Sequence, residues 1–237
     1  MLQIRCQTKF SKNNPMNKTR NFSEYYKNRF SSQEEKNKNL MWKVLCKFYL
    51  QKFVRNSDTV LDLGAGYCEF INNIECKKKI AVDINPDVKK YANKNVKIIN
   101  KGVFDISKKM NNSVDVVFVS NFLEHLNTKD EVVDILNRVN KLLKSGGKII
   151  LLQPNIDLVK ESYWDFIDHK VALNTKSIKE ALEISNFKIV LFIKRFLPYT
   201  TKNRRIPMLI FLLKIYISLP SFLRLLAGQT FVVAVKK

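Results

Sequence analysis

Acidic residues are scarce in this sequence. Its 237 residues hold 21 Asp and Glu against 42 Lys and Arg, a formal net charge of +21, and no acid follows Glu183. An excess of this size raises nucleic acid and acidic membrane surfaces as partners. The basic residues, however, are mostly Lys scattered through a chain rich in Lys, Asn and Ile, as a codon-usage bias would produce. The sequence therefore argues against nucleic acid as the partner.

Cysteine is also rare, and long apolar runs are absent. The cysteines show no C-x-x-C pair and no metal-ligand spacing, so we expect reduced, mostly buried thiols of a cytoplasmic protein at Cys6, Cys46, Cys68 and Cys76. No apolar run reaches the ~20 residues that span a bilayer. Residues 1–22 are basic and lack the apolar stretch of a signal peptide, so we expect a disordered arm there.

The stretch that organises the chain is a strand followed by a glycine turn. Thr59–Leu63 is a short β-branched and apolar run, Gly64-Ala65-Gly66 follows at once, and residues 67–75 can be helical. A buried strand, a tight turn and a helix start are typical of the nucleotide-binding beginning of a doubly wound α/β sheet. Gly64 and Gly66 can adopt positive φ and let a ligand lie against the backbone.

The charge beside this turn argues against a dinucleotide. A dinucleotide fingerprint requires a third glycine where this chain has Glu69. The Glu69 carboxylate would repel a pyrophosphate at the helix N-terminus, where the helix dipole should attract the anion. Asp62, at the end of the strand, adds a second negative charge. The pocket therefore suits a cationic ligand.

The rest of the chain continues the alternation of strands and helices. We expect helices capped by Asn85, Thr128 and Ser177. Further strands are expected at Lys79–Asp83, Val96–Ile99, Val114–Ser120, Lys148–Leu152, Phe187–Ile193 and Thr230–Val235. The last two can pair antiparallel, whereas the nearly all-apolar run Val114–Ser120 is typical of a strand buried on both faces.

Two further acids follow the second and third strands. Asp83 comes 19 residues after Gly64, where a carboxylate at the end of the neighbouring strand can accept both hydroxyls of a ribose. Asp105 lies in the loop after the third strand. It could hydrogen-bond an adenine amino group beside Phe104 and Ile106.

Five sequence blocks together resemble the class I S-adenosylmethionine-dependent methyltransferases. They occur in that superfamily's order and spacing over roughly residues 40–195, and they are Val60-Leu-Asp-Leu-Gly-Ala-Gly66, Ala81-Val-Asp-Ile-Asn85, Phe104-Asp105, Asp115-Val-Val-Phe-Val-Ser-Asn-Phe-Leu-Glu-His-Leu126 and Leu143-Lys-Ser-Gly-Gly-Lys-Ile-Ile150. The resemblance implies a Rossmann-like α/β fold: a mostly parallel sheet with an antiparallel C-terminal hairpin and helices on both faces.

The resemblance also implies the cofactor, S-adenosyl-L-methionine, and its site. The cofactor's sulfonium and ammonium would give Asp62 and Glu69 a favourable electrostatic partner. Cys68 stands where many members have a third glycine, and we expect it to fit because only the first two glycines need a close backbone approach. The implied cofactor-binding residues are Asp62, Gly64, Ala65, Gly66, Asp83, Ile84, Phe104, Asp105, Ile106 and Asn121.

Candidate catalytic residues are the two histidines and a neighbouring acid. Methyl transfer to a hydroxyl requires alignment, exclusion of water and removal of a proton. His125 follows the fourth strand, where open α/β sheets bind ligands, so it is either a general base or a packing residue. His169 and Asp168 lie in an aromatic, acidic loop that would overhang the acceptor. Glu124 could orient His125 or bind a cation, but one Glu–His pair is poor evidence, and we predict no metal site.

Two segments flank this core. We expect residues 23–57 to form a helical lid, or a helix packed beside the sheet, and residues 58–237 to form the main domain. A basic and apolar insert at 197–229 could contact an anionic membrane surface, or instead cover the sheet edge or form a dimer surface. Residues 162–237, with Tyr163-Trp-Asp-Phe166, resemble a bacterial branch of the superfamily associated with surface polysaccharides and glycans.

The sequence therefore predicts O-methylation of a small-molecule or glycan-linked acceptor, with His125 or His169 assisting proton removal. The expected location is cytoplasmic, with peripheral contact at the inner membrane face as an addition. Two alternatives belong to other classes: a nucleic-acid-binding or RNA-methylating protein that uses the basic surface, and a non-catalytic, membrane-associated scaffold.

Overall fold

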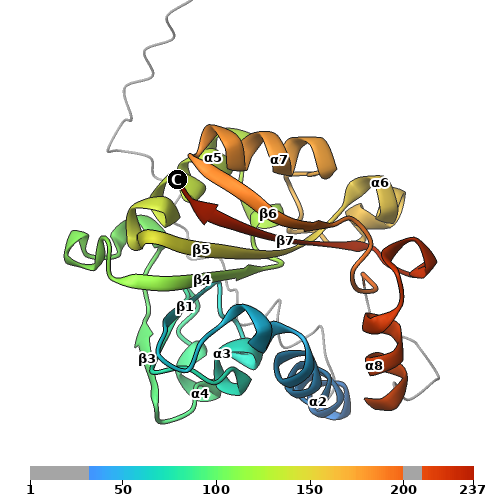
Figure 1. The fold of residues 1–237 in the computed structure, drawn as a ribbon, viewed down its shortest axis with the longest axis horizontal. Coiled ribbons are helices and arrows are strands. Elements are labelled where there is room, and N and C mark those ends of the chain that lie inside the picture. The colour runs from blue at the N-terminus through green and yellow to red at the C-terminus, as the bar shows by residue number, and fades with distance from the viewer. Residues whose placement is uncertain (1–31, 200–209) are drawn as a thin grey trace, which may run out of the picture.

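A single seven-stranded sheet forms the centre of the computed structural model, which describes residues 32–199 and 210–237 (Figure 1). Its strand order is β3-β2-β1-β4-β5-β7-β6. All pairs are parallel except those of β7, which runs antiparallel to both β5 and β6. The strands are β1 Thr59–Leu63, β2 Lys78–Val82, β3 Val96–Ile99, β4 Val114–Ser120, β5 Leu143–Pro154, β6 Phe187–Ile193 and β7 Gln229–Lys236. The predicted fold class is confirmed.

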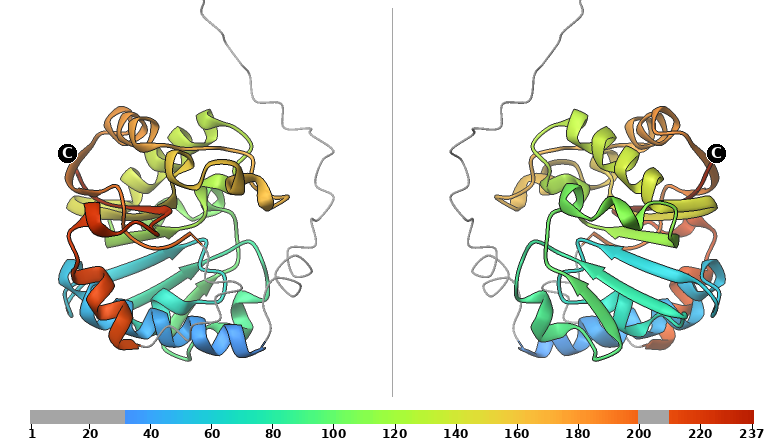
Figure 2. Two further views of the ribbon diagram at one scale, coloured as in Figure 1. Left: turned by 90° about the vertical axis from the view of Figure 1, so that its right-hand side faces the viewer. Right: turned by 90° about the vertical axis from the view of Figure 1, so that its left-hand side faces the viewer.

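Helices cover both faces of the sheet. The views in Figures 1 and 2 place α5 and α7 on one face, and α2, α3, α4 and α8 on the other. The helices are α2 Ser32–Phe48, α3 Glu69–Asn73, α4 Val88–Tyr91, α5 Lys129–Leu142, α6 Ile156–Val159, α7 Thr175–Ile184 and α8 Ile210–Ser218. Short 3₁₀ turns are Leu50–Phe53, Val103–Asp105, Lys108–Met110, Leu123–His125, Lys160–Asp165 and Ser221–Leu223.

The alternation of side chains along β4 divides the core into two layers. Val117 and Val119 pack with residues of α5 and α7, whereas Val116 and Phe118 pack with residues of α2, α3 and α8. In the second layer the ring of Phe118 stacks on Phe70 with centroids 3.8 Å apart. Successive strand residues point to opposite faces, so a strand covered on both faces must be apolar throughout.

Two of the three predicted helix starts differ in detail from the structure. Thr128 caps α5 as expected, since its Oγ1 accepts a hydrogen bond from the Glu131 N–H. The cap of α7 is Asn174 rather than Ser177, which instead completes the capping box at the third helical position. Asn85 caps no helix: its side chain accepts from the Asp87 N–H in a turn that precedes α4.

Cys68 is accommodated after the glycine turn, but with a backbone cost that the sequence did not indicate. Its backbone has φ of 61°, in the left-handed region that glycine enters most easily. The position therefore favours glycine because of its backbone conformation, and a cysteine there costs about 1–2 kcal/mol. The Cys68 side chain is fully buried, and this burial offsets the backbone cost. The same burial raises the pKa of the Cys68 thiol to about 12. Cys46 is buried too, as predicted, whereas Cys76 is partly exposed.

The flanking segments are only partly described. The predicted arm 1–22 and the first residues of the predicted lid lie outside the described residues. α2 contacts α3 and α8, and Trp42 and Leu45 on α2 are buried. In the insert, Leu213 and Ile217 of α8 are buried in the core layer beneath the sheet, so α8 covers this face. Among the described helices, none is long and apolar enough to cross a membrane.

Candidate active site

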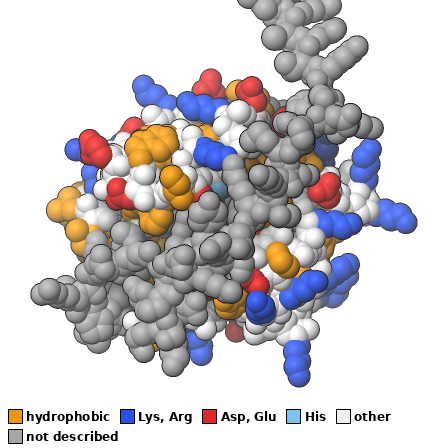
Figure 3. All heavy atoms as spheres, turned by 180° about the vertical axis from the view of Figure 1, so that it is seen from behind, with side chains coloured by type: hydrophobic (Ala, Val, Ile, Leu, Met, Phe, Trp, Pro, Cys, Tyr) orange, Lys and Arg blue, Asp and Glu red, His pale blue; other side chains and the backbone are white. Residues whose placement is uncertain are grey.

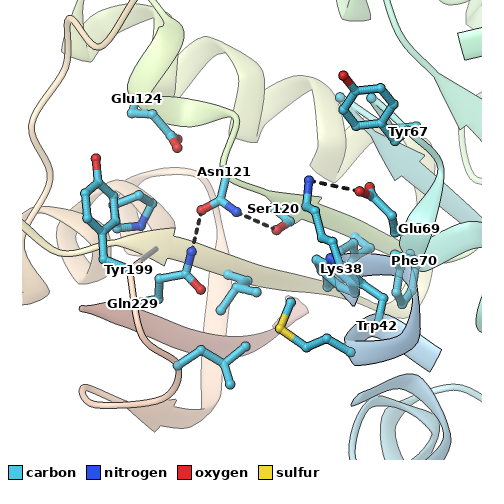
Figure 4. Close-up of a pocket in the computed structure, with 18 of the residues that line it drawn as sticks. Lys38, Trp42, Tyr67, Glu69, Phe70, Ser120, Asn121, Glu124, Tyr199 and Gln229 are labelled. Atoms are coloured by element: carbon cyan, nitrogen blue, oxygen red, sulfur yellow. Dashed lines mark hydrogen bonds and ion pairs between the residues drawn. The ribbon is translucent and has the colours of Figure 1, made fainter. Parts of the chain in front are cut away.

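A cavity opens at the carboxyl ends of the central strands. In Figure 4, Lys38 and Glu69 lie at one end of it, Glu124 and Tyr199 at the other, and Asn121 between them. Its walls come from α2, the glycine turn after β1, the end of β4, the loop that precedes α7, and the two ends of the insert. Of the predicted site residues, the cavity is lined by Asp62, Gly64, Ala65, Gly66, Asn121, His125 and His169.

The glycine turn has the backbone that the sequence predicts. Gly64 and Gly66 have φ of 71° and 50°. A Cβ on Gly64 would lie 2.6 Å from Cδ2 of Phe122, whereas a Cβ on Gly66 would meet no atom within 4 Å. Gly64 is therefore required by packing as well as by its backbone. Gly66 instead faces the open cavity, where a ligand can lie against the main chain.

Acidic side chains surround this turn. Asp62 is 3 % exposed, and its pKa is raised well above its usual value, first by burial and then by the charges of Glu69 and Asp83. Lys38 of α2 forms an ion pair with Glu69 at 2.9 Å. Trp42 offers a buried indole N–H that has no hydrogen-bond partner in the described structure. The acids could bind a cationic group of a ligand, and the unpaired Trp42 N–H could donate to a carboxylate. This part of the cavity therefore suits the amino acid portion of a ligand, which carries both groups.

Asp83 is held against the glycine turn. Its two carboxylate oxygens accept hydrogen bonds from the N–H groups of Gly66 and Asn85, both at 2.7 Å. Burial is the largest influence on its pKa, which is raised, while these two hydrogen bonds act in the opposite direction. Each oxygen keeps a further lone pair, so the carboxylate can still accept hydroxyl groups of a ribose.

The remaining predicted cofactor residues lie outside the cavity. Ile84 and Phe104 are 60 % and 58 % exposed, which is unusual for large apolar side chains and leaves them free to contact a flat ring. Asp105 ends the 3₁₀ turn after β3. Ile106, however, is 3 % exposed and packs in the core, so we do not include it in the proposed adenine site.

At the other end of the cavity the two histidine rings lie together. Their centroids are 5.1 Å apart. Nδ1 of His125 lies 3.3 Å from Oδ2 of Asp168, and Nδ1 of His169 lies 2.9 Å from the backbone oxygen of Tyr163. Burial lowers the pKa of His169, which leaves this imidazole neutral near pH 7. The three predicted catalytic residues therefore lie next to one another in the structure, although Asp168 does not itself line the cavity.

Several residues of the site were not predicted from the sequence. Lys38, Trp42 and Tyr199 line the cavity, as does Gln229, whose Nε2 donates to Oδ1 of Asn121 at 2.8 Å. Their positions in the chain carry no motif, and Tyr199 and Gln229 reach the site only because the insert returns to the sheet. Asn121 has φ of 47°, a left-handed conformation that Asn tolerates better than most residues.

The comparisons with known proteins agree with this geometry. Residues 61–151 match the methyltransferase domain family. No curated protein matches the sequence significantly. Among solved structures, a SAM-dependent methyltransferase from Archaeoglobus fulgidus is similar, with 23% identity, a TM-score of 0.60, and coverage of 86% of this chain and 98% of that one. A possible histamine N-methyltransferase from Thermotoga maritima gives 13% identity, a TM-score of 0.61, and coverage of 90% and 99%.

Fold, glycine turn and sequence match together define a methyltransferase. Residues 61–151 are a methyltransferase domain, and the solved structures of similar fold are S-adenosylmethionine-dependent methyltransferases, so the implied cofactor is S-adenosylmethionine. The residues present fit that cofactor, because Gly66 leaves backbone space that a Cβ would fill and buried acids face the same cavity.

Proposed function

We propose that this methyltransferase transfers its methyl group to an oxygen of a small-molecule or glycan-linked acceptor. The observation that supports this most is the position of its two histidines. Both line the cavity that also contains the open face of Gly66, so an acceptor beside the imidazoles would also lie beside the bound cofactor.

The proposed reaction is an in-line displacement. The acceptor hydroxyl loses its proton with the help of His125 or His169, and its oxygen forms a bond to the methyl carbon. The bond from that carbon to sulfur breaks, and the electron pair stays on sulfur as S-adenosylhomocysteine leaves. Asp168, at 3.3 Å from His125 Nδ1, orients this ring.

The walls around the histidines favour a polyhydroxylated acceptor. Phe166 and Tyr199 contribute aromatic surface with ring centroids 5.8 Å apart, and Glu124 contributes a carboxylate. Aromatic faces stack on the C–H faces of sugar rings, while carboxylates accept their hydroxyls. Trp164, in the same loop, is 53 % exposed and does not line the cavity.

The first experiment is calorimetric titration of the full chain with S-adenosylmethionine and S-adenosylhomocysteine, beside an Asp83→Ala variant. We expect micromolar binding to the wild type and a loss of at least about tenfold in the variant, since the ribose acid is removed. Labelled methyl transfer to sugars, nucleotide sugars, phenols and amines then identifies the acceptor. Transfer to amines alone would contradict the proposed oxygen acceptor.

We also propose peripheral contact with an anionic membrane surface, from a cytoplasmic location. Four large apolar side chains cluster within five residues of the insert and are 51–76 % exposed: Phe222, Leu223, Leu225 and Leu226. No acid follows Glu183 in the sequence, and Arg195 donates a hydrogen bond to the backbone oxygen of Leu225, which places a basic side chain beside this apolar tip. Apolar side chains with basic flanks are what an interfacial contact requires.

Co-sedimentation with lipid vesicles tests this contact. We expect binding to vesicles that contain anionic lipid. The double change Leu225→Ser and Leu226→Ser should reduce it, whereas Ile167→Ser, which changes a still more exposed apolar side chain elsewhere, should not. Equal binding by both variants would contradict a specific role for the tip. Retained binding of S-adenosylmethionine shows that the variants are folded.

The surface gives less support to nucleic acid. On the face shown in Figure 3, the Lys and Arg side chains are spread among acidic and apolar ones rather than gathered in one patch. Phosphate contacts from a contiguous basic surface would make affinity fall steeply with salt. A polynucleotide titration that showed such a dependence, together with methylation of RNA, would replace the small-acceptor proposal.

A further inference from the structure

The cluster at the acceptor end of the cavity contains a third ligand-type side chain. Glu124, His125 and His169 each offer one ligand atom, and these atoms all lie within 4.8 Å of one another. We propose that these three residues bind a divalent transition-metal ion, which revises the prediction of no metal site.

The arrangement of the imidazole nitrogens supports this proposal. Nδ1 of His125 faces Asp168, with both the backbone oxygen and Oδ2 of that residue at 3.3 Å. Nδ1 of His169 faces the backbone oxygen of Tyr163 at 2.9 Å. Each ring therefore has its Nδ1 paired with a carboxylate or carbonyl, which leaves Nε2 for the metal. Metal-binding histidines almost always have such a partner, because it selects the tautomer and fixes the ring.

The carboxylate of Glu124 supplies the matching charge. Glu124 is 1 % exposed, and in the described structure the side chain that hydrogen-bonds to its carboxylate is Gln153, whose Nε2 donates to Oε2 at 2.8 Å. A neutral amide does not balance a buried negative charge, whose desolvation is costly unless a cation is near. A divalent ion between Glu124 and the imidazoles would provide that balance.

Local structure brings two of the three ligands into place. Glu124 and His125 lie in the 3₁₀ turn Leu123–His125 directly after β4, and the backbone oxygen of Glu124 accepts hydrogen bonds from the N–H groups of Lys170 and Val171. These bonds attach the His169 loop to the turn. Metal–ligand distances of about 2.0–2.2 Å require the three atoms to approach to roughly 3 Å, so we expect the side chains to rotate inward on binding.

The donor set selects the class of metal. Two imidazole nitrogens and one carboxylate favour borderline ions such as Zn²⁺, Mn²⁺, Fe²⁺ or Co²⁺ over Mg²⁺ and Ca²⁺, which prefer oxygen ligands. Three protein ligands leave coordination positions open. Methyl transfer needs no redox change, so the ion would act as a Lewis acid.

The metal would deepen the proposed function, and its catalytic role depends on that function. An acceptor hydroxyl bound in an open position would lose its proton more readily, because the ion stabilises the alkoxide or phenolate. The proton would leave to water, the oxygen would form the bond to the methyl carbon, and the thioether would leave as before. The imidazoles would then hold the ion instead of taking the proton.

Metal binding is tested without methyl transfer, on the full chain after treatment with a chelator. Titration with Co²⁺ and Zn²⁺ against a chromophoric chelator should show one tightly bound ion per chain. His169→Gln and Glu124→Gln should each weaken that binding at least about tenfold, since they remove one ligand. Glu161→Gln, which changes an exposed glutamate nearby, should bind like the wild type. The chain has only two histidines, so imidazole signals in the Co²⁺ complex report on this cluster alone.

The outcomes separate the two proposals. Metal affinity that is equal in the wild type and the ligand variants would overturn the metal site, as would absence of metal binding in a wild type that binds S-adenosylmethionine. Full methyl transfer in excess chelator would overturn the catalytic role of the ion while the proposed function stood. Metal binding without any binding of S-adenosylmethionine would overturn the proposed function and leave the metal site intact.

Discussion

The carboxylate of Asp83 accepts a hydrogen bond of 2.7 Å from the backbone N–H of Gly66. This contact joins the end of β2 to the glycine turn after β1, so the expected ribose acid and the expected cofactor turn are held as one unit. Asn85 donates to the other carboxylate oxygen at the same distance, which fixes the rotation of the side chain. The turn is therefore pre-organised before the cofactor binds.

The two glycines of the turn should differ when each is replaced by alanine. Gly66→Ala should lower the free energy of unfolding by about 1–2 kcal/mol, the cost of a left-handed alanine, and should abolish cofactor binding because its Cβ enters the cavity. Gly64→Ala should cost about 2–4 kcal/mol, because its Cβ also meets Phe122. Denaturant unfolding and calorimetric titration measure the two effects. Tight cofactor binding by Gly66→Ala would refute the assigned contact.

Replacement of Asp62 by asparagine should stabilise the protein without cofactor. The raised pKa means that folding favours the protonated carboxyl, so stability falls as pH rises from the unfolded pKa of ~3.9 through the raised folded value. At pH 7 Asp62→Asn should therefore raise Tm by about 2–6 °C, and below pH 4 the gain should disappear. Thermal melts across pH provide the measurement, and a lower Tm at pH 7 would contradict it.

The same replacement should weaken binding of S-adenosylmethionine more than binding of S-adenosylhomocysteine. Only the former carries a sulfonium charge near the buried acid. In the wild type, affinity for S-adenosylmethionine should rise as pH rises through the raised pKa of Asp62, since the ionised form attracts the cation. Titrations of both ligands at several pH values measure this, and equal losses for the two would argue against contact between Asp62 and the sulfonium.

The ion pair between Lys38 and Glu69 should tune the preference between the same two ligands. Lys38→Met leaves the Glu69 charge unbalanced, so it should increase the ratio of S-adenosylmethionine to S-adenosylhomocysteine affinity by about two- to fivefold. Glu69→Gln should decrease that ratio by a similar factor. Both ligands carry the same carboxylate, so any effect of the variants on contacts with that group is removed when the two affinities are compared as a ratio. Changes in the same direction for both variants would refute the electrostatic explanation.

Arg224 should matter for stability rather than for membrane contact. It is 5 % exposed, and its guanidinium donates to the backbone oxygens of Leu219 and Ile217, both at 2.8 Å, at the end of α8. Arg224→Met leaves these carbonyls without their donor and should lower the free energy of unfolding by about 2–4 kcal/mol. The exposed control Lys194→Met should change it by less than about 0.5 kcal/mol. Chemical unfolding of both variants tests the difference.

Local sequence determined the strands and the cofactor turn. Apolar runs of strand length, a glycine pair and acids after successive strands depend on interactions between near neighbours, so β3, β4 and β6 have the predicted bounds. Helix ends were harder to place, because Ser177 and Asn174 both suit a cap and only the backbone geometry chose Asn174. The left-handed backbone of Cys68 was not predicted, because cysteine, unlike glycine or asparagine, gives no indication of that conformation.

The tertiary structure decided the acceptor end of the site. His169 lies 44 residues after His125 in the sequence, and no spacing rule connects them, yet their rings are 5.1 Å apart. The Glu124 backbone oxygen holds the loop that carries His169, and the return of the insert to the sheet brings in Tyr199 and Gln229. A sequence pattern records contacts along one strand or helix, whereas a three-ligand cluster depends on how separate segments pack. The glycine turn and the acids that follow the strands were therefore predictable from the chain, whereas the candidate metal cluster could be recognised only from the fold.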